Sequence, residues 1–305
     1  MLRDFVPPIV IATAKRLVHR ARRKQYPTYE TALMDCPEHG HENEDIVNVV
    51  LHKTKKYRDG ILSGGPIHLS APDAYTLCSI LTSIGERELH VLDFGGACGA
   101  HYFLARAVLS PACRMKWIVV ETPEMAQRAK TALGTCELTF TSDLREAADS
   151  LKRIDLLHTS GTLQHVNNPE GYLKTIVSLG ATHILLNRLG LTEGFHDIIT
   201  VQESWLSWHG PGPMPSGFQD RKVRCPCVFL RKMAFDKAIS MNYDIVMRFE
   251  DQSGVFPVDG ESIIGLGLLA RLKRERRAAR TELPVNRSGD SQSLLKMMWC
   301  LCSNR

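Results

Sequence analysis

A run of small residues directly after an apolar stretch is the part of the sequence best suited to hold a cofactor. The apolar segment His90–Phe94 (HVLDF) contains the acid Asp93, and Gly95-Gly96-Ala97-Cys98-Gly99 follows at once. Glycine takes positive φ angles without strain and lets a ligand approach the backbone. The helix expected over residues 101–109 would direct free N–H groups and its positive dipole end at the same place. The pattern therefore predicts a pocket for a nucleotide-type cofactor.

Asp93 and Ala97 decide which class of cofactor this is. A dinucleotide fingerprint has its second glycine where Ala97 stands, so that a pyrophosphate can approach. Asp93 would repel a pyrophosphate, whereas it would attract the cationic amino group of a methionine moiety. The pattern acid-x-Gly-x-small-x-Gly resembles the first motif of class I S-adenosylmethionine-dependent methyltransferases, D/E-x-G-x-G-x-G. The resemblance implies that the acid lies near the amino-acid end of that cofactor. It also implies a set of cofactor-binding residues: Asp93, Phe94, Gly95, Gly96, Ala97 and Gly99.

A second acid follows the next apolar run. Glu121 ends the segment Lys116–Val120, and Thr122-Pro123 follow it. A carboxylate at this place could accept hydrogen bonds from both ribose hydroxyls of a cofactor. The alternative is a solvent-facing acid that opens a helix at Pro123. Two acids at the ends of neighbouring expected strands, with a glycine turn between them, favour the binding site over this alternative. We therefore count Glu121 and Thr122 among the expected cofactor-binding residues.

Two later segments supply the remaining candidates. Ser142-Asp143 ends the third expected strand, where the family usually contacts the adenine, but Asp143 is equally suited to cap a helix. The loop from Thr159 onward follows the fourth strand, and ligands of open α/β sheets bind outside such carboxyl ends. Thr159 and Gln164 are therefore candidate cofactor ligands. His165 is the candidate general base for a hydroxyl acceptor, and a structural histidine packed over the cofactor is the alternative.

Alternating strands and helices must position these residues. Such a rhythm predicts an α/β fold, a Rossmann-like doubly wound and mostly parallel sheet covered on both faces. Two late strands without a full crossover between them predict a terminal antiparallel hairpin, and residues 26–87 predict a helical cap with a loop at Ser63–Pro66. The expected strands are 88–94, 116–121, 137–140, 154–158, 183–187, 198–202, 243–248 and 263–272.

The charge is unevenly distributed along the 305 residues. The net charge is +5, yet the basic residues concentrate in a basic amphipathic segment, 1–25, and in a tail, 273–305, which we expect to be disordered. The body between them, with a methyltransferase domain expected over 88–272, is acidic, so the charge gives no argument for nucleic-acid binding. A helix over 7–24 could contact an anionic membrane surface, and docking on its own domain is the alternative.

The cysteines and histidines give no metal site. The nine cysteines lack a disulfide-scaffold pattern, and no signal peptide is recognisable, which together predict a cytoplasmic protein, with peripheral contact at the inner membrane face as an option. The segment Cys36–His41 collects possible ligands, but no second ligand pair with structural-zinc spacing accompanies it. Cys225-Pro226-Cys227 and Cys300-Leu301-Cys302 lack a partner set as well. We therefore assign no metal.

More closely, the chain resembles a group of bacterial methyltransferases associated with surface-polysaccharide gene sets. The resemblance implies methyl transfer to a small-molecule or glycan acceptor, with O-methylation of a sugar or glycan intermediate as the expected reaction. Group members more often have an aromatic residue where His165 stands, so a catalytically degenerate cofactor-binding or partner-recruiting module is one alternative. An NAD-dependent oxidoreductase, disfavoured by Asp93 and Ala97, is another. The segments that carry the resemblance are Tyr26–Ala32, Leu92–Gly96, Glu121–Pro123, Leu163–His165, Asn187-Arg188 and Thr200–Gln202.

Overall fold

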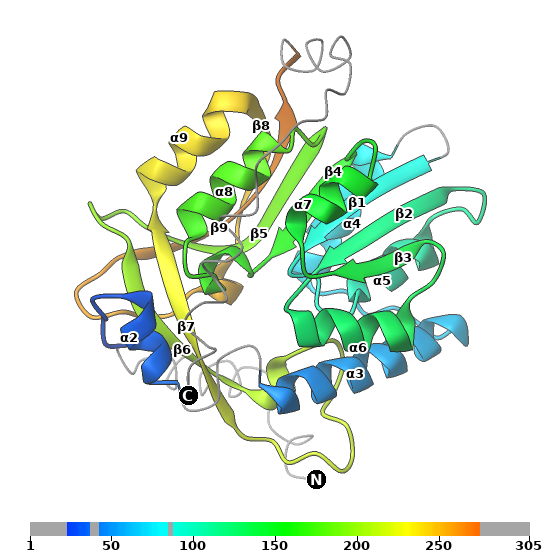
Figure 1. The fold of residues 1–305 in the computed structure, drawn as a ribbon, viewed down its shortest axis with the longest axis horizontal. Coiled ribbons are helices and arrows are strands. Elements are labelled where there is room, and N and C mark those ends of the chain that lie inside the picture. Colours follow the sequence, from blue (N-terminus) through cyan, green and yellow to red (C-terminus); the bar gives the residue numbers. More distant parts are fainter. Residues whose placement is uncertain (1–22, 37–42, 85–87, 275–305) are drawn as a thin grey trace. The chain divides into compact units, whose positions relative to one another are not determined.

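Five parallel strands form the centre of the fold in the computed structural model, which describes residues 23–36, 43–84 and 88–274 (Figure 1). Their spatial order is β3-β2-β1-β4-β5. The chain therefore changes direction between β1 and β4, which is the place where open α/β sheets bind ligands at their carboxyl ends. The strands are β1 (Glu88–Phe94), β2 (Arg114–Val120), β3 (Leu138–Thr141), β4 (Leu156–Ser160) and β5 (His183–Thr192).

Two late strands complete the sheet beyond β5. Strand β9 (Ile263–Leu272) pairs antiparallel with the whole length of β5, and β8 (Tyr243–Glu250) pairs antiparallel with β9. The predicted α/β class, the mostly parallel sheet and the terminal antiparallel hairpin are all confirmed.

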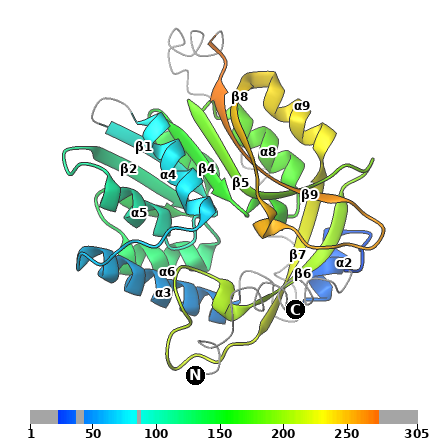
Figure 2. The same ribbon diagram turned by 180° about the vertical axis from the view of Figure 1, so that it is seen from behind.

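Helices cover both faces, as the two-residue alternation of apolar side chains requires. In β1, Leu89 and Val91 belong to the core under α3 to α6, whereas Leu92 and Phe94 belong to the core under α7 to α9. Figure 2 shows α3, α4 and α5 on the first of these faces, and Figure 1 shows α7, α8 and α9 on the other. The crossover helices are α5 (Ala100–Val108), α6 (Pro123–Leu133), α7 (Leu144–Ser150), α8 (Pro169–Ser178) and α9 (Lys232–Asn242).

The N-terminal cap is helical, as predicted. It contains α2 (Tyr29–Met34), α3 (Glu44–Leu62) and α4 (Ala71–Ser83), and the expected loop follows α3. Capping boxes at Thr28 and Ser70 start α2 and α4, because each hydroxyl accepts a bond from the third residue of its helix.

One hairpin departs from the prediction. Strand β6 (Ile198–Trp205) was expected, but its partner β7 (Lys222–Arg231) was not. Pro226 lies in the middle of β7, and proline argues against a strand. The structure tolerates it because β7 pairs with β5 only at Leu230 and Arg231, so that Pro226 has a strand neighbour, β6, on one side. The hairpin is an addition between β5 and α9.

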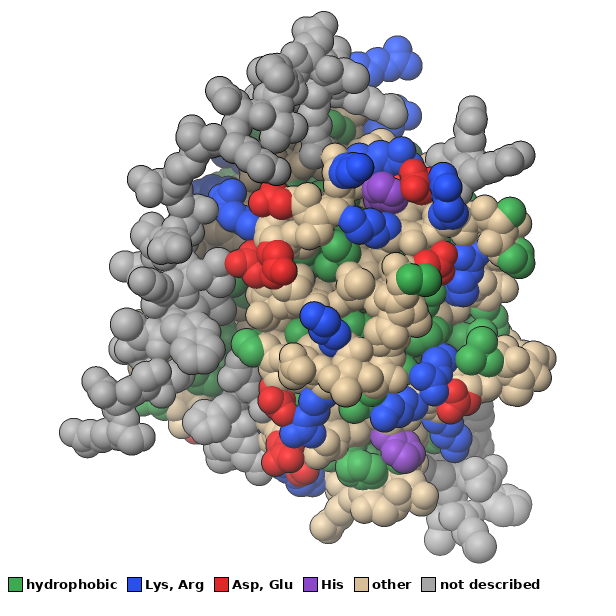
Figure 3. Space-filling model, turned by 45° about the vertical axis from the view of Figure 1, so that its right-hand side comes forward, with side chains coloured by type: hydrophobic (Ala, Val, Ile, Leu, Met, Phe, Trp, Pro, Cys, Tyr) green, Lys and Arg blue, Asp and Glu red, His purple; other side chains and the backbone are tan. Residues whose placement is uncertain are grey.

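The N-terminal helix prediction lies mostly outside the described residues. Where the description begins, Arg23 bridges to Val258 and Gln25 bridges to Thr200, so a helix reaching residue 24 is wrong at its end. The expected disordered tail lies outside the described residues except at 273 and 274, as do 37–42 of the polar loop. No helix in the described ranges is both long and apolar enough to cross a bilayer. Acidic and basic side chains are interspersed on the face shown in Figure 3.

Candidate functional site

The glycine turn, Gly95–Gly99, joins β1 to α5 at the carboxyl edge of the sheet. Gly95 and Gly99 have φ angles of 73° and 78°, in the left-handed region that favours glycine. Gly96 is required for another reason, because a Cβ there would lie 2.4 Å from Asp93 Oδ2. Ala97 has a φ of 50°. The turn therefore keeps its shape without the second glycine, at a cost of about 1 kcal/mol.

Glu121 lies directly against this turn. Its Oε1 accepts a hydrogen bond of 3.0 Å from the Ala97 N–H, and its Oε2 accepts one of 2.9 Å from the Thr122 N–H. Burial raises the pKa of Glu121, and the two backbone donors act against that rise. A carboxylate has more lone pairs than two bonds use. The glycine turn and Glu121 thus form one unit, here called the cofactor cradle, that retains acceptor capacity for a hydroxyl pair.

Asp93 has a different environment from the one that the sequence predicted. It is fully buried, Trp117 Nε1 donates to its Oδ2 at 3.1 Å, and His158 Nδ1 donates to its Oδ1 at 2.8 Å. Both oxygens are therefore engaged inside the protein, beneath the turn. The geometry favours a role in which Asp93 holds the turn from within, rather than contact with the amino end of a cofactor.

His158, on β4, is the partner that the sequence analysis missed. Thr76 Oγ1 donates to the Pro72 carbonyl at 3.0 Å and lies 3.3 Å from His158 Nε2. Both ring nitrogens of His158 therefore have a partner, Asp93 at Nδ1 and Thr76 at Nε2. Burial raises the pKa of Asp93, but the charge and hydrogen bond of His158 hold it below its ordinary value.

Three buried polar atoms near this edge have no hydrogen-bond partner among the described residues. They are Thr122 Oγ1 after β2, Thr159 Oγ1 in β4 and His101 Nδ1 in the first turn of α5. An unsatisfied buried polar atom costs about 1–3 kcal/mol. Bonds from a ligand or water bound near this edge would reduce that cost, so the chemistry of the edge fits a polar cofactor.

The two residues predicted to contact the adenine have different environments. Ser142 is exposed after β3, at the carboxyl edge. Asp143 caps α7, because its Oδ1 accepts from the backbone N–H groups of Arg145 at 2.7 Å and Glu146 at 3.0 Å. The capping role that the sequence left open is thus present. Contact of either residue with an adenine stays a prediction.

Gln164 fills a fork in the sheet. Strand β4 pairs with β5 as far as Asn187, and β7 joins the same strand at Leu191. Between these points Gln164 Oε1 accepts from the Gly190 N–H at 2.9 Å, and its Nε2 donates to the Gly254 carbonyl at 3.3 Å. The side chain is 2% exposed. The geometry favours a structural role for Gln164 over the predicted contact with a cofactor.

His165 ends the short 3₁₀ helix η3 (Leu163–His165). Its Nδ1 lies 2.9 Å from the Pro226 carbonyl, to which only a protonated Nδ1 can donate. Its own carbonyl accepts from the Tyr29 hydroxyl at 2.9 Å. Burial lowers the pKa of His165 to about 4. An efficient general base has a pKa closer to the working pH, so the surroundings favour a positioning role, and catalysis by His165 stays a prediction.

One group of side chains has the composition of a metal site. Ligand atoms of Asp93, His101 and His158 lie within 4.8 Å of one another, and this is the one such group in the described ranges. The hydrogen bonds of Asp93 and His158 already use the atoms that a metal would need. We assign no metal to the group, and the absence of a metal from the protein stays a prediction.

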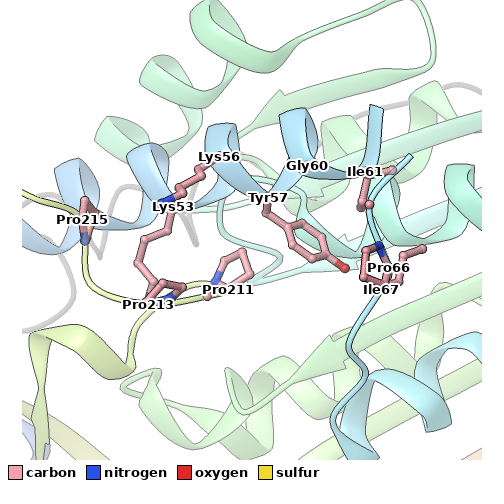
Figure 4. Close-up of a pocket in the computed structure, with 12 residues that line it drawn as sticks. Lys53, Lys56, Tyr57, Gly60, Ile61, Pro66, Ile67, Pro211, Pro213 and Pro215 are labelled. Atoms are coloured by element: carbon pink, nitrogen blue, oxygen red, sulfur yellow. The ribbon is translucent and has the colours of Figure 1, made fainter. Parts of the chain in front are cut away.

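A cavity of about 230 Å³ lies between α3 and the proline-rich loop after β6 (Figure 4). Tyr57, Pro66 and Pro211 are among the residues that line it. Lys53, on the same wall, donates from Nζ to the carbonyls of Ser207 at 2.9 Å and His209 at 2.7 Å. Burial lowers the pKa of Lys53. The lysine thus attaches α3 to the loop that carries His209, which the sequence did not indicate.

Comparisons with known proteins give matches of fold only. No family model and no curated protein matches the sequence. The chain is similar to the N-terminal domain of EvdMO1, solved in the presence of SAH and D-fucose, with 17% identity over 68% of this chain and 85% of that one, and a TM-score of 0.42. An S-adenosylmethionine-dependent methyltransferase from Clostridium acetobutylicum has 9% identity over 72% of this chain and 98% of that one, with a TM-score of 0.42. The sugar N-methyltransferase KedS8 from Streptoalloteichus has 11% identity over 67% and 88%, with a TM-score of 0.40.

Proposed function

We propose that the chain is an S-adenosylmethionine-dependent methyltransferase. The observation that carries the proposal is the hydrogen bond between Glu121 and the Ala97 N–H, because it joins the acid after β2 to the glycine turn after β1. Glu121 would hold the ribose hydroxyls, and the turn would lie along the methionine moiety. When bound, this cofactor supplies a methyl group on a sulfonium, which is already activated for transfer.

The chain's own contribution is then to position the acceptor. Alignment of two reactants can supply much of the rate of a group transfer. The hairpin of β6 and β7 and the helix α2 would form the acceptor side, since Tyr29 and Pro226 both bond to His165. Neutral His165 is a weak base at a pKa of about 4, so we assign more of the rate to alignment than to proton removal.

A sugar or glycan intermediate is the acceptor class that we propose. The sequence resemblance supports this class, through Leu163–His165, Asn187-Arg188 and Thr200–Gln202. All three segments lie on or beside the proposed acceptor side: η3, the β5 segment beyond β4, and β6. The methylated atom is left open by this proposal.

Isothermal titration tests the cofactor. We expect S-adenosylmethionine and its demethylated product to bind, and NAD⁺ and NADH not to bind. Glu121→Gln removes the charge and should weaken binding about tenfold or more. The control is Glu124→Gln, in the first turn of α6, where the side chain pairs with Arg128. Equal affinities in wild type and Glu121→Gln, or binding of NADH instead, would overturn the proposal.

A binding module without transfer activity is the second candidate, and the low pKa of His165 is the observation that favours it. Formation of the demethylated cofactor, measured with a panel of sugars, sugar phosphates and cell extracts, separates the two. Cofactor binding with no product above background in any mixture would favour the binding module.

A further inference from the structure

Arg188 has an unusual backbone conformation at the carboxyl edge of the sheet. Its φ is 55°, and together with Ala97 it makes up the non-glycine residues of positive φ in the described ranges. It lies in a bulge, because the register between β5 and β9 shifts between Leu186 and Leu189. Bulges re-aim side chains, and they are common beside active sites.

Surrounding groups hold this conformation in place. The Arg188 N–H donates to Asn187 Oδ1 at 3.0 Å and to Asp251 Oδ2 at 3.2 Å. Asn187 is itself held, because its Nδ2 donates to the Pro72 carbonyl at 3.1 Å. A Cβ on Gly254 would lie 2.5 Å from the Arg188 carbonyl oxygen, so the opposing segment can approach only as glycine. A strained residue persists where its surroundings over-determine it, which is typical of functional sites.

The side chain that this bulge directs is a cation without a counter-charge. Arg188 is exposed, and no carboxylate within the described part of the chain pairs with its guanidinium. The guanidinium runs along Gly161, where a Cβ would meet Arg188 Cζ at 3.8 Å. Gly161 is the first residue after β4 and opens the loop that contains His165. The cation therefore lies beside the loop that leads from β4 to the proposed acceptor side.

Three histidines from three different segments lie within the electrostatic reach of Arg188. They are His101 in α5, His165 in η3 and His209 after η4 (Leu206–Trp208). Burial is the largest cause that lowers the pKa of each to about 4, and the charge of Arg188 lowers all three further. At neutral pH these three imidazoles are therefore neutral and add no positive charge of their own beside Arg188.

Three acids near this group have other partners than the Arg188 guanidinium. Asp251 uses its oxygens on the Arg188 backbone N–H and on Ser253. Asp73 Oδ1 lies 3.9 Å from His101 Nε2, on the α4 side, and its Oδ2 caps α4 at Ser70. Asp93 is paired with His158. Among the described residues, no carboxylate occupies the place beside the Arg188 guanidinium that an incoming anion would take.

We propose that Arg188 binds an anionic group of the methyl acceptor, a carboxylate or a phosphate. A guanidinium presents paired N–H donors that match both groups. The inference rests on the proposed methyltransferase function, because it specifies the charge of that enzyme's acceptor. Applied to a sugar acceptor, it selects an acidic sugar or a phosphorylated or nucleotide-linked sugar over a neutral one.

The test follows the Nε–H signal of Arg188 in ¹H–¹⁵N spectra, assigned by its loss in Arg188→Lys. Sodium acetate and inorganic phosphate are the probes, at constant ionic strength, with and without saturating demethylated cofactor. We expect a saturable shift with at least one anion and none with glucose. A larger response to acetate indicates a carboxylated acceptor, and a larger response to phosphate indicates a phosphorylated one.

Variants separate this role from charge and from folding. Arg188→Gln and Arg188→Gly should weaken binding of the responding anion about tenfold or more. Glycine fits a φ of 55° without strain, so Arg188→Gly keeps the fold while it removes the cation. Arg114→Gln, at the exposed amino end of β2, makes the same charge change at the opposite edge and should have no effect.

Two results would overturn the inference. The first is an Arg188 signal that neither anion shifts. The second is an Arg188→Gln variant whose affinity for the demethylated cofactor falls as much as its affinity for the anion, because Arg188 would then hold the cofactor's own carboxylate. Failure of the methyltransferase proposal is distinguishable from both, since it would appear as absent cofactor binding in the wild type while the Arg188 signal still responds to anions.

Discussion

The carboxyl edge of the sheet has two parts that are built by different means: the donor side, which is the cofactor cradle with the strands β1, β2 and β4 beneath it, and the proposed acceptor side next to β5. On the donor side, β1, β2 and β4 form regular parallel ladders, and a buried ion pair between Asp93 and His158 holds the glycine turn from below. On the acceptor side, β5 bulges at Arg188 and forks around Gln164. The ladder of the first side is continuous, whereas the ladder of the second side is interrupted. Under the proposed function this difference is expected, since the cofactor is the same for all methyltransferases and the acceptor differs between them.

Breaking the ion pair tests the donor side and should have the largest effect. Asp93→Asn removes the buried carboxylate that accepts from His158 Nδ1, and loss of one partner from a buried pair costs about 3–5 kcal/mol. We expect the free energy of unfolding, measured by urea denaturation, to fall by that amount. A loss below about 1 kcal/mol would contradict the assignment of an ion pair.

The double variant Asp93→Asn/His158→Gln is the control for this pair. If the two side chains interact as described, the double variant is destabilised less than the sum of the single variants. Additive losses would show that each residue stabilises the sheet independently of the other.

Acid should destabilise the acceptor side through its buried histidines. Burial lowers the pKa of His165 to about 4, against about 6.5 in an unfolded chain. Between these values the unfolded chain binds a proton that the folded chain does not, so stability falls as the pH decreases from 6.5 to 4. For His165 alone the loss is on the order of 2–3 kcal/mol. The lowered pKa of Asp93 acts in a separate window, because its contribution is lost only as the pH falls through that lower value.

Urea denaturation across this pH range checks the assignment. His165→Asn should lose less stability on acidification than the wild type. His196→Asn is the matched control, because that histidine side chain is 73% exposed. A pH dependence that is the same in His165→Asn and wild type would show that His165 is not protected from protonation.

The donor side was predictable because its signals are local. The spacing of Asp93, the glycine turn and Glu121 indicated strand, turn and strand, and the structure brings Glu121 and Ala97 within 3.0 Å. Local spacing could not indicate that Asp93 is buried and has both oxygens bonded inside the protein. Its partners, Trp117 and His158, lie on the two strands that flank β1. A histidine at the end of the apolar segment 154–158 was the available signal.

The acceptor side was not predictable because its contacts span the chain. Gln164 bonds to Gly254, and His165 bonds to Pro226. No periodicity connects such positions, and Pro226 argued against the strand in which it lies. The sequence indicated no role for Arg188 beyond its place in one of the segments that carry the family resemblance. Its φ angle, which singles it out, is held by Asp251 and Gly254, which lie far away in the sequence, as well as by its neighbour Asn187.

The fork in β5 can be tested at Gln164. Gln164→Leu keeps most of the volume but leaves the Gly190 N–H and the Gly254 carbonyl without this partner. Unpaired buried backbone groups should lower the free energy of unfolding by about 2 kcal/mol. Gln127→Leu, on an exposed position of α6, is the control. A Gln164→Leu variant that keeps its stability but loses affinity for the cofactor would instead restore the role predicted from the sequence.

The smallest expected effect compares the two left-handed residues directly. Ala97→Gly relieves the strain of a φ of 50° and should raise the free energy of unfolding by about 1 kcal/mol. Ala132→Gly, in the last turn of α6, makes the same chemical change at a helical position and should lower it, by at most about 1 kcal/mol. Because Ala97 offers the cofactor only its backbone, Ala97→Gly should keep its affinity for the demethylated cofactor. Arg188→Gly relieves similar strain but should lose its response to anions. If Ala97→Gly also lost affinity for the demethylated cofactor, the strained backbone at Ala97 would contribute to binding. A strained residue would then be needed on both sides, and the contrast between them would be smaller.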